Sequence, residues 1–330
     1  MEKSLRINLQ DRCFGSNLQD DNNKTKKGST LMKKVLIPTK LDKVVSEILA
    51  AKGFTVVQDM ETPFLDLAKA NADTESIIVR SEKVTPEIMD ALPALKLVVR
   101  AGAGYDNVDL EAATAHNVCV MNTPGQNSNA VAELAFGMMI MAVRNFYDGK
   151  SGTELMGKKL GIHAYGNVGR NVARIAKGFG MEIYAFDAFC PKEVIEKDGV
   201  KAVSSAEELY AACNIVSLHI PATAETKNSI NYELVNKMPK GGVLVNTARK
   251  EVINEEELVK LMADRPDFKY ISDIAPDNAA EYAQFEGRYF FTPKKMGAQT
   301  EEANVNAGLA AARQIVAFLE HGDAKFKVNK

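Results

Sequence analysis

Strand-like apolar runs alternate with longer stretches of helical periodicity from about residue 33 onward. In the first part of the chain these runs predict strands at residues 35–38, 55–58, 76–79, 97–100 and 119–122. A long helical stretch follows at about residues 128–148. Six further strands are then predicted at residues 159–164, 182–187, 214–220, 242–246, 270–274 and 289–292.

This alternation indicates a fold of the α/β class, with parallel sheets covered by helices. The second series of strands has the size of a doubly wound nucleotide-binding domain. A last helix, at about residues 300–320, is followed by too little chain to form a domain, so we expect it to pack on the first one. The length of 330 residues also exceeds what one hydrophobic core usually serves, which favours two domains.

The first 32 residues differ from the rest of the chain. Residues 19–29 are polar and have little to bury, so residues 1–32 are predicted to be a disordered N-terminal extension. Met32 directly precedes the first predicted strand. The extension is therefore either a flexible part of the native protein or a segment upstream of a true start at Met32, and both interpretations stay open.

Composition and charge exclude several classes of partner. The net charge of −2 gives no reason to expect a nucleic acid or an anionic membrane surface as partner. The cysteines Cys13, Cys119, Cys190 and Cys213 lack metal-ligand spacing, so we expect reduced thiols, no metal site and a cytoplasmic protein. The apolar run at residues 134–143 is shorter than the ~20 residues that a membrane span needs.

A glycine-rich segment at residues 161–169 joins a predicted strand to a helix. It matches the dinucleotide-binding fingerprint, with Ala164 in place of the first glycine. Gly166 would let the backbone approach a pyrophosphate, and Gly169 would let helix and strand pack closely. The free N–H groups at the helix start, where Asn167 and Val168 lie, would hold the anion.

A carboxylate at the end of the next strand strengthens this interpretation. Asp187 stands where an acid would accept hydrogen bonds from the adenosine ribose and repel a 2′-phosphate, which favours NAD over NADP. The alternative is a structural glycine-rich turn next to a strand-end Asp.

Further segments occur in a fixed order along the chain: 79–81, 100–109, 122–125 with 132–134, 217–221, 245–249, and 292–293 with 297–303. They resemble the substrate loops, the interdomain crossing, the loops beside the nicotinamide and the final active-site loop of the D-2-hydroxyacid dehydrogenase family. The resemblance covers residues 33 to about 320. It implies two Rossmann-like domains, with a doubly wound NAD-binding domain at residues 128–299 inserted into a smaller, flavodoxin-like substrate domain at residues 33–127 and 300–330. It also implies a homodimer whose interface includes the helix at 128–148.

The resemblance assigns roles to particular residues. Arg249 would hold the substrate carboxylate, and Asp273 would bind the nicotinamide carboxamide. Other positions that would contact NAD are Ile220, Pro221, Thr247, Ala248, Arg249, Gly297 and Ala298.

Within the family, the pair Arg80 and Arg100 is most similar to the phosphoglycerate dehydrogenases. A phosphorylated 2-hydroxy acid carries extra negative charge, which arginine forks suit. The residues predicted to contact the substrate are Arg80, Ser81, Arg100, Ala101, Gly102, Arg249 and Arg144. Of these, Arg144 would reach the substrate across the dimer interface. Alternatively, Arg100 pairs with a carboxylate, and Arg144 forms an ordinary salt bridge.

The family usually moves the hydroxyl proton with a His paired to a Glu, and this chain departs from that pattern. Asn278 stands at the Glu position, and Lys295 stands at the His position when counted back from Gly297. Lys294 is the rival when counted from Pro293, and His219 is a third candidate. An ordinary lysine has a pKa near 10.4. We expect burial and Arg249 to lower the pKa of Lys295, with no acidic partner to oppose them.

The predicted function is the reversible, NAD-dependent oxidation of D-3-phosphoglycerate to 3-phosphohydroxypyruvate, the first step of serine biosynthesis. One alternative is reduction of hydroxypyruvate, glyoxylate or another 2-oxo acid. An alternative of another class is a non-catalytic dimer that senses NAD(H), because the usual His and Glu are missing.

Overall fold

The computed structural model describes residues 33–330 of the chain. The predictions for residues 1–32 and for Cys13 lie outside the described residues.

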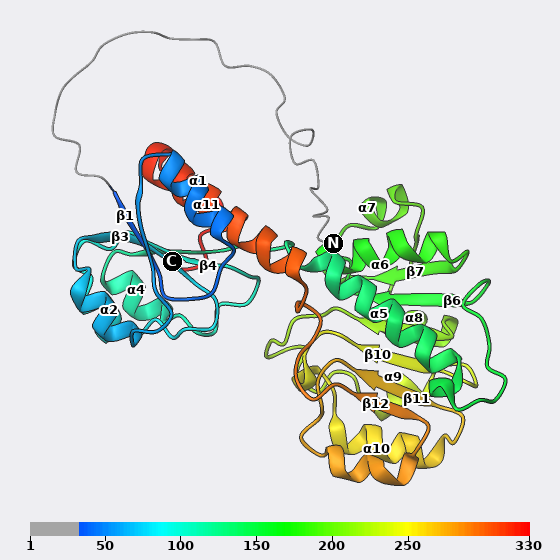
Figure 1. The fold of residues 1–330 in the computed structure, drawn as a ribbon. Helices are drawn as coiled ribbons and strands as arrows, with labels where there is room; N and C mark the ends of the chain where they lie inside the picture. The colour runs from blue at the N-terminus through cyan, green and yellow to red at the C-terminus, as the bar shows by residue number, and fades with distance from the viewer. Residues whose placement is uncertain (1–32) are drawn as a thin grey trace, which may run out of the picture. The chain divides into compact units, whose positions relative to one another are not determined.

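The first part of the described chain forms a five-stranded parallel sheet (Figure 1). Its strands are β1 (Lys34–Ile37), β2 (Thr55–Gln58), β3 (Thr74–Val79), β4 (Leu97–Arg100) and β5 (Cys119–Asn122). Their order, β2-β1-β3-β4-β5, is that of a flavodoxin-like sheet. All five predicted strands are therefore confirmed, with boundaries that differ by two residues at most.

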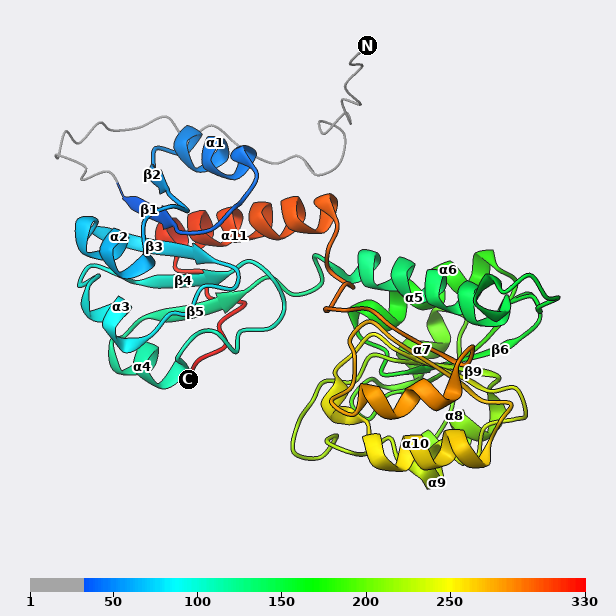
Figure 2. The same ribbon diagram turned by 60° about the horizontal axis from the view of Figure 1, so that its bottom comes forward.

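Helices cover both faces of this sheet. They are α1 (Lys43–Ala51), α2 (Phe64–Ala70), α3 (Pro86–Asp90), α4 (Leu110–Ala115) and the C-terminal α11 (Glu301–His321). Neighbouring strand residues such as Ile77 and Ile78 belong to the cores on opposite faces, which explains why the strands are continuously apolar. Helix α11 lies beside α1 (Figure 2) and buries Ala311 and Ile315 against the sheet. The last helix thus packs where the sequence places it.

The C-terminal residues close the edge of this sheet. The N–H of Val328 donates to the carbonyl of Val120 at 2.8 Å. Asn329 accepts from the N–H of Val120 at 2.9 Å and donates to the carbonyl of Val118 at 2.9 Å. An exposed strand edge is thereby covered.

The second sheet has seven parallel strands. They are β6 (Lys159–His163), β7 (Glu182–Phe186), β8 (Lys201–Ala202), β9 (Ile215–Leu218), β10 (Val243–Asn246), β11 (Lys269–Ser272) and β12 (Tyr289–Phe291). The order β12-β11-β10-β9-β6-β7-β8 is doubly wound and reverses between β6 and β9. The prediction of six strands was one short, because β8 has only two residues and no apolar run.

The helices of this part are α5 (Ser128–Val143), α6 (Asn167–Gly178), α7 (Lys192–Lys197), α8 (Ala206–Ala212), α9 (Tyr232–Asn236) and α10 (Glu255–Asp264), with short 3-10 turns η1 (Asn145–Tyr147), η2 (Lys250–Val252) and η3 (Ala279–Phe285). Helix α5 ends at Val143, not near residue 148 as predicted. Asn145, Phe146 and Tyr147 have φ angles of 50°, 55° and 61°, which a right-handed helix does not accommodate.

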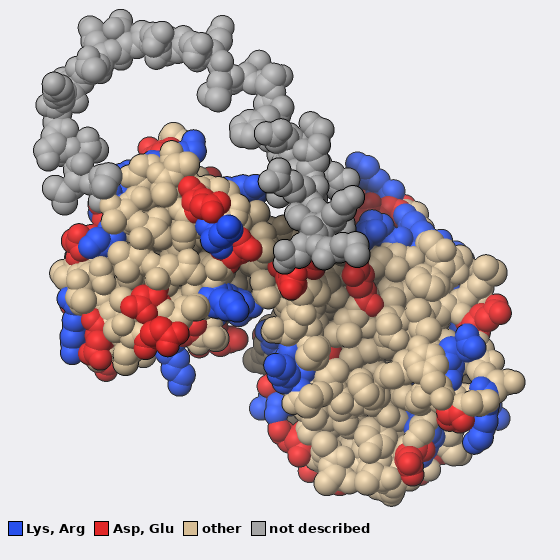
Figure 3. Space-filling view, in the orientation of Figure 1, with Lys and Arg blue, Asp and Glu red and all other residues tan. Residues whose placement is uncertain are grey.

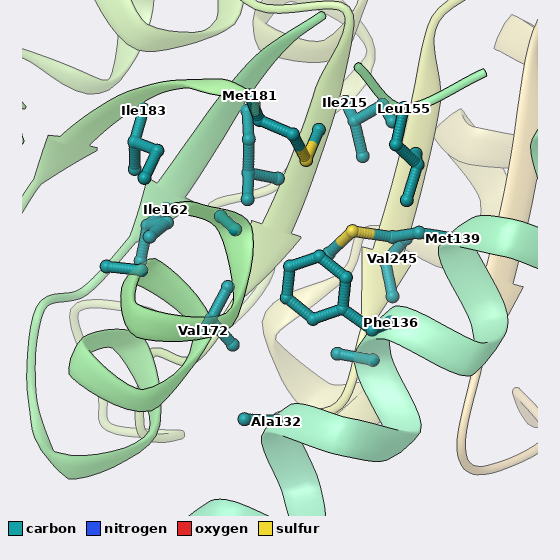
Figure 4. Packing of buried hydrophobic residues seen from close by; sticks show 14 of the residues in the cluster. Ala132, Phe136, Met139, Leu155, Ile162, Val172, Met181, Ile183, Ile215 and Val245 are labelled. Carbon is teal, nitrogen blue, oxygen red and sulfur yellow. The ribbon is translucent and has the colours of Figure 1, made fainter. Parts of the chain in front are cut away.

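Helix α5 packs against the second sheet and α6 (Figure 4). Phe136 and Met139 of α5 meet Val172 of α6 and strand residues such as Ile162 and Val245. The apolar run at residues 134–143 is therefore part of a protein core. Among the described helices none is long and apolar enough to cross a membrane.

These contacts support the predicted division into residues 33–127 with 300–330 and residues 128–299, which we keep as a proposal. On the described surface visible in Figure 3, basic and acidic side chains are interspersed. Within residues 33–330, His, Cys, Asp and Glu do not gather into a metal-binding group, and Cys119, Cys190 and Cys213 are free thiols.

Candidate active site

The loop between β6 and α6 has the geometry of a dinucleotide cradle. Gly166 is the N-cap of α6, and a Cβ added to it would meet nothing within 4 Å. A Cβ at Gly169 would lie 2.3 Å from the carbonyl oxygen of Ala164, so only glycine fits there. The first N–H groups of α6, from Asn167 and Val168, point out of the helix end without intrahelical acceptors. Open space before an electropositive helix end fits a pyrophosphate.

The departure from the fingerprint at Ala164 is visible in the backbone. Ala164 has a φ of 81°, in the left-handed region that favours glycine. We expect Ala164→Gly to stabilise the protein by roughly 0.5–1 kcal/mol, because glycine removes this strain. Urea denaturation checks this. Ala263→Gly on the exposed face of α10 is the control and should cost about 1 kcal/mol. A loss of stability in Ala164→Gly would contradict the strain argument.

Asp187 lies next to this loop at the carboxyl end of β7. Its Oδ2 accepts from the N–H of Tyr165 at 2.6 Å, and its Oδ1 accepts from the N–H groups of Phe189 and Cys190 at 2.8 and 2.9 Å. The carboxylate is thus fixed beside the glycine loop. This is the position at which a ribose hydroxyl would reach it.

The two predicted substrate loops follow β3 and β4. The guanidinium of Arg80 donates to Oδ1 of Asn304 in α11 at 2.6 Å. Nε of Arg100 donates to the carbonyl of Arg80 at 3.0 Å. A Cβ on Gly102 would fall 1.5 Å from Nη1 of Arg100, so the guanidinium lies directly over this glycine. Ala101, between them, is buried.

Two residues that hold these loops were not anticipated from the sequence. Oε2 of Glu82 accepts from the N–H groups of Arg80 and Ser81 at 2.8 and 3.1 Å, so the Ser81 N–H is already engaged. Asn304 comes from the last helix, and no local pattern marks it as a partner of Arg80.

Arg100 does not pair with an acid, which was the alternative left open. Within residues 33–330 no carboxylate lies within ion-pair distance of Arg80, Arg100 or Arg249. Burial lowers the pKa of Arg100, the charges of Arg80 and Arg249 lower it further, and the weaker effects of Asp106 and Glu82 raise it. A Cβ at Gly104 would lie 3.5 Å from Nη2 of Arg249, which places Arg249 beside the second substrate loop.

Lys295 has an acidic partner, so the expectation that it lacks one is wrong. Its Nζ donates to Oδ1 of Asp273 at 2.6 Å and to the carbonyl of Thr247 at 3.1 Å. Burial lowers the pKa of Lys295, as expected, and Asp273 acts in the opposite direction. The charge of Arg249 also lowers this pKa. Asn278, at the family's Glu position, instead contacts Glu255 in α10.

The two rival proton carriers differ from Lys295. Lys294 is exposed. His219 is partly buried, with Nδ1 3.4 Å from Oγ1 of Thr247, and its buried Nε2 has no hydrogen-bond partner in the described part of the chain. Burial lowers the pKa of His219 to about 3, with smaller contributions from His163 and Lys295. A neutral His219 is therefore a poor proton carrier.

The other predicted cofactor positions follow the carboxyl ends of neighbouring strands, where α/β sheets bind ligands. Ile220 and Pro221 follow β9, and Thr247 and Ala248 follow β10. Gly297 donates its N–H to Oδ2 of Asp273 at 3.0 Å, and Ala298 comes next in the chain. Arg144 is exposed at the end of α5 and forms no ion pair among the described residues, so the alternative of an ordinary salt bridge is not seen there, and its role across a dimer stays a prediction.

Comparison with known proteins gives a consistent result. Residues 128–285 match the family described as "D-isomer specific 2-hydroxyacid dehydrogenase, NAD binding domain". A solved NAD+-bound 3-phosphoglycerate dehydrogenase from Entamoeba histolytica is 44% identical, with a TM-score of 0.79, and the match covers 91% of this chain and 99% of that one.

Two curated relatives are similar. The D-3-phosphoglycerate dehydrogenase of Methanocaldococcus jannaschii is 34% identical over 90% of this chain, which spans 60% of that protein. The hydroxypyruvate reductase of Thermotoga maritima is 36% identical over 66% of this chain and 74% of its own. With its two parallel sheets and the glycine loop of the second, the chain belongs to the D-isomer specific 2-hydroxyacid dehydrogenase family.

Proposed function

We propose that the protein is an NAD-dependent dehydrogenase of a phosphorylated 2-hydroxy acid, and that it oxidises D-3-phosphoglycerate reversibly to 3-phosphohydroxypyruvate. The observation that carries this proposal is the cluster formed by Arg80, Arg100 and Arg249, whose guanidinium groups lack carboxylate partners in residues 33–330. Asp106 and Glu82 offset part of this positive charge, and a strongly anionic ligand would balance the rest.

The charge of the substrate matches this cluster. 3-Phosphohydroxypyruvate carries a carboxylate and a phosphate of about −1.5 to −2 at neutral pH. Arg249 would hold the carboxylate, while Arg80 and Arg100 would hold the phosphate in charge-assisted hydrogen bonds. Hydroxypyruvate, glyoxylate or pyruvate would bring no negative charge to Arg80 and Arg100, whose charge Asp106 and Glu82 offset only in part.

The residues present fit NAD(H). Gly166, Asn167, Val168 and Gly169 would hold the pyrophosphate, and Asp187 the adenosine ribose. When bound, the reduced cofactor supplies the hydride. In the reductive direction Arg249 would orient the 2-oxo acid, and Lys295 would donate a proton from Nζ to the C2 oxygen.

Two alternatives to oxidation of a phosphorylated 2-hydroxy acid have different requirements. Reduction of unphosphorylated hydroxypyruvate is favoured by the similarity to the Thermotoga maritima hydroxypyruvate reductase. A non-catalytic NAD(H)-sensing dimer would need neither the arginine cluster nor Lys295. A homodimer and a cytoplasmic location remain predictions, with Arg144 reaching the partner's substrate.

The cofactor preference follows from Asp187. We expect the kcat/KM with NADH to exceed that with NADPH, because the fixed carboxylate repels a 2′-phosphate. The Asp187→Ser variant should have a higher kcat/KM with NADPH, which lowers the ratio of kcat/KM with NADH to that with NADPH. Steady-state rates with both cofactors check this, and equal or faster turnover of NADPH by the unmodified protein would contradict the assignment.

The role of Arg80 is tested by comparing two substrates. Arg80→Ala should reduce kcat/KM for 3-phosphohydroxypyruvate by roughly 10–100-fold, the worth of a charged hydrogen bond, and change that for hydroxypyruvate little. Arg313→Ala on the exposed side of α11 is the control and should leave both unchanged. If both substrates suffer equally from Arg80→Ala, then Arg80 does not recognise the phosphate.

Turnover itself separates an enzyme from a sensor. NADH absorbance is followed while 3-phosphohydroxypyruvate, hydroxypyruvate, glyoxylate and pyruvate are added in turn. We expect the fastest decrease with 3-phosphohydroxypyruvate. Binding of NADH without consumption in the presence of every one of these acids would favour the sensing dimer.

A further inference from the structure

We propose that Asp273 is a positioning residue for Lys295 that holds it as an ammonium ion, so that the protein carries a Lys–Asp pair where the family usually has a His–Glu pair. The inference rests on the proposed function, in which Lys295 donates the proton. It assigns Asp273 a task within this chain, whether or not the same carboxylate also contacts the cofactor.

The geometry of the pair is that of a built ion pair. Asp273 follows β11, is fully buried, and donates its N–H to the carbonyl of Asn246 at 3.0 Å. Each of its two carboxylate oxygens accepts a hydrogen bond: Oδ1 from Nζ of Lys295 at 2.6 Å, and Oδ2 from the Gly297 N–H at 3.0 Å. The Gly297 contact fixes the end of the loop that carries Lys295. A second acceptor, the carbonyl of Thr247, orients Nζ.

The charges around Lys295 come from three strand ends. Asp273 follows β11, and Arg249 and Glu251 follow β10. His219 follows β9 and is neutral in this buried position. Of the two acids, Asp273 alone has its carboxylate in contact with Nζ within the described residues. Arg249 opposes the ammonium, so Asp273 is the group that favours it.

The pairing with Asp273 explains how Lys295 would keep its proton. A buried ammonium without a counter-charge loses its proton readily. In the reductive direction the donor must hold its proton until the substrate takes it. Asp273 stabilises that form, and its carboxylate still offers acceptor positions, because two oxygens accept about four hydrogen bonds and the structure uses two of them.

The test is Asp273→Asn, which keeps the size of the side chain and removes its charge. The reductive rate depends on the ammonium, so it is full below the pKa of Lys295 and is lost as pH rises through it. In the variant this alkaline loss should move to lower pH by a unit or more. At one alkaline pH, reduction should therefore fall about tenfold or more, while oxidation, which needs neutral Lys295, falls less.

The protonation of Lys295 can also be measured without turnover, by NMR titration of its Nζ. The Lys295 signal is assigned by its loss in Lys295→Met. The midpoint of this titration should fall in Asp273→Asn. Asp73→Asn is the matched control, because the exposed pair of Asp73 and Lys34 has the same 2.6 Å separation. The control should change neither the titration nor the pH profile. NADH binding by fluorescence is measured in parallel.

Each outcome supports or overturns the inference. Weaker NADH binding with an unchanged titration would mean that Asp273 serves the cofactor only, which overturns it. If Asp273→Asn does not fold, Asp273→Asn/Lys295→Met should regain stability, and a double variant as unstable as the single one overturns the pairing. An active Lys295→Ala would refute the donor role itself, a failure of the proposed function that the Asp273 measurements do not share.

Discussion

Replacing Lys295 by alanine is expected to slow the reduction of 3-phosphohydroxypyruvate by roughly 10²–10⁴-fold, the usual worth of a general acid. Its partly buried side chain, 33% exposed, places Nζ between the ends of β10 and β11 and near Arg249. No other proton carrier takes its place there, because His219 is held neutral by burial. NADH should still bind, because the groups proposed to hold its pyrophosphate and adenosine ribose, at the start of α6 and at Asp187, remain in place.

Lys294→Ala is the matched control for this variant. Lys294 lies in the bend after β12 and is exposed, whereas Lys295 is partly buried and bonded to Asp273. Lys294→Ala should therefore retain wild-type rates. Single-turnover reduction with saturating NADH measures both variants. A fast Lys295→Ala together with a slow Lys294→Ala would move the role to Lys294, and two fast variants would end the lysine hypothesis.

Arg249→Ala should lower kcat/KM by about 10²–10³-fold for every 2-oxo acid, phosphorylated or not. The reason is that Arg249 is proposed to hold the carboxylate that all these substrates share. Removing one partner of a desolvated charge pair costs about 3–4 kcal/mol, which corresponds to this range. Arg249→Lys should recover only part of the rate, because an ammonium lacks the planar fork that fits a carboxylate.

Arg80→Ala and Arg249→Ala should differ in which substrates they affect. Arg80→Ala should discriminate between phosphorylated and unphosphorylated substrates, and Arg249→Ala should not. Rates with 3-phosphohydroxypyruvate and glyoxylate give the comparison. A loss in Arg249→Ala confined to the phosphorylated substrate would show that the two arginines have been assigned the wrong way round.

The strands and the glycine loop were predictable from sequence because their causes are local. A strand covered by helices on both faces must be apolar throughout, and the fingerprint needs glycine where a Cβ would meet a carbonyl at 2.3 Å. Strand β8 escaped prediction because its two residues, Lys201 and Ala202, are too few to show a pattern. The end of α5 was misplaced because left-handed backbone at Asn145–Tyr147 has no residue signature without glycine.

The contacts of the site depended on tertiary structure. Asp273 and Lys295 are separated by 22 positions and meet only because β11 and β12 are adjacent in the sheet. Arg80 and Asn304 are separated by 224 positions and meet because the last helix returns to the first sheet. The resemblance to the family, counted back from Gly297, made Lys295 the candidate proton donor, whereas its acidic partner required the fold.

The proposed preference for a phosphorylated substrate is tested most directly by one ratio. NADH-dependent kcat/KM is measured for 3-phosphohydroxypyruvate and for hydroxypyruvate, which differ only in the phosphate. Two arginines with charge-assisted hydrogen bonds predict a preference for the phosphorylated acid of roughly 10²-fold or more. A ratio near one, or a preference for hydroxypyruvate, would contradict the assignment of the arginine cluster and leave an unphosphorylated 2-oxo acid as the substrate.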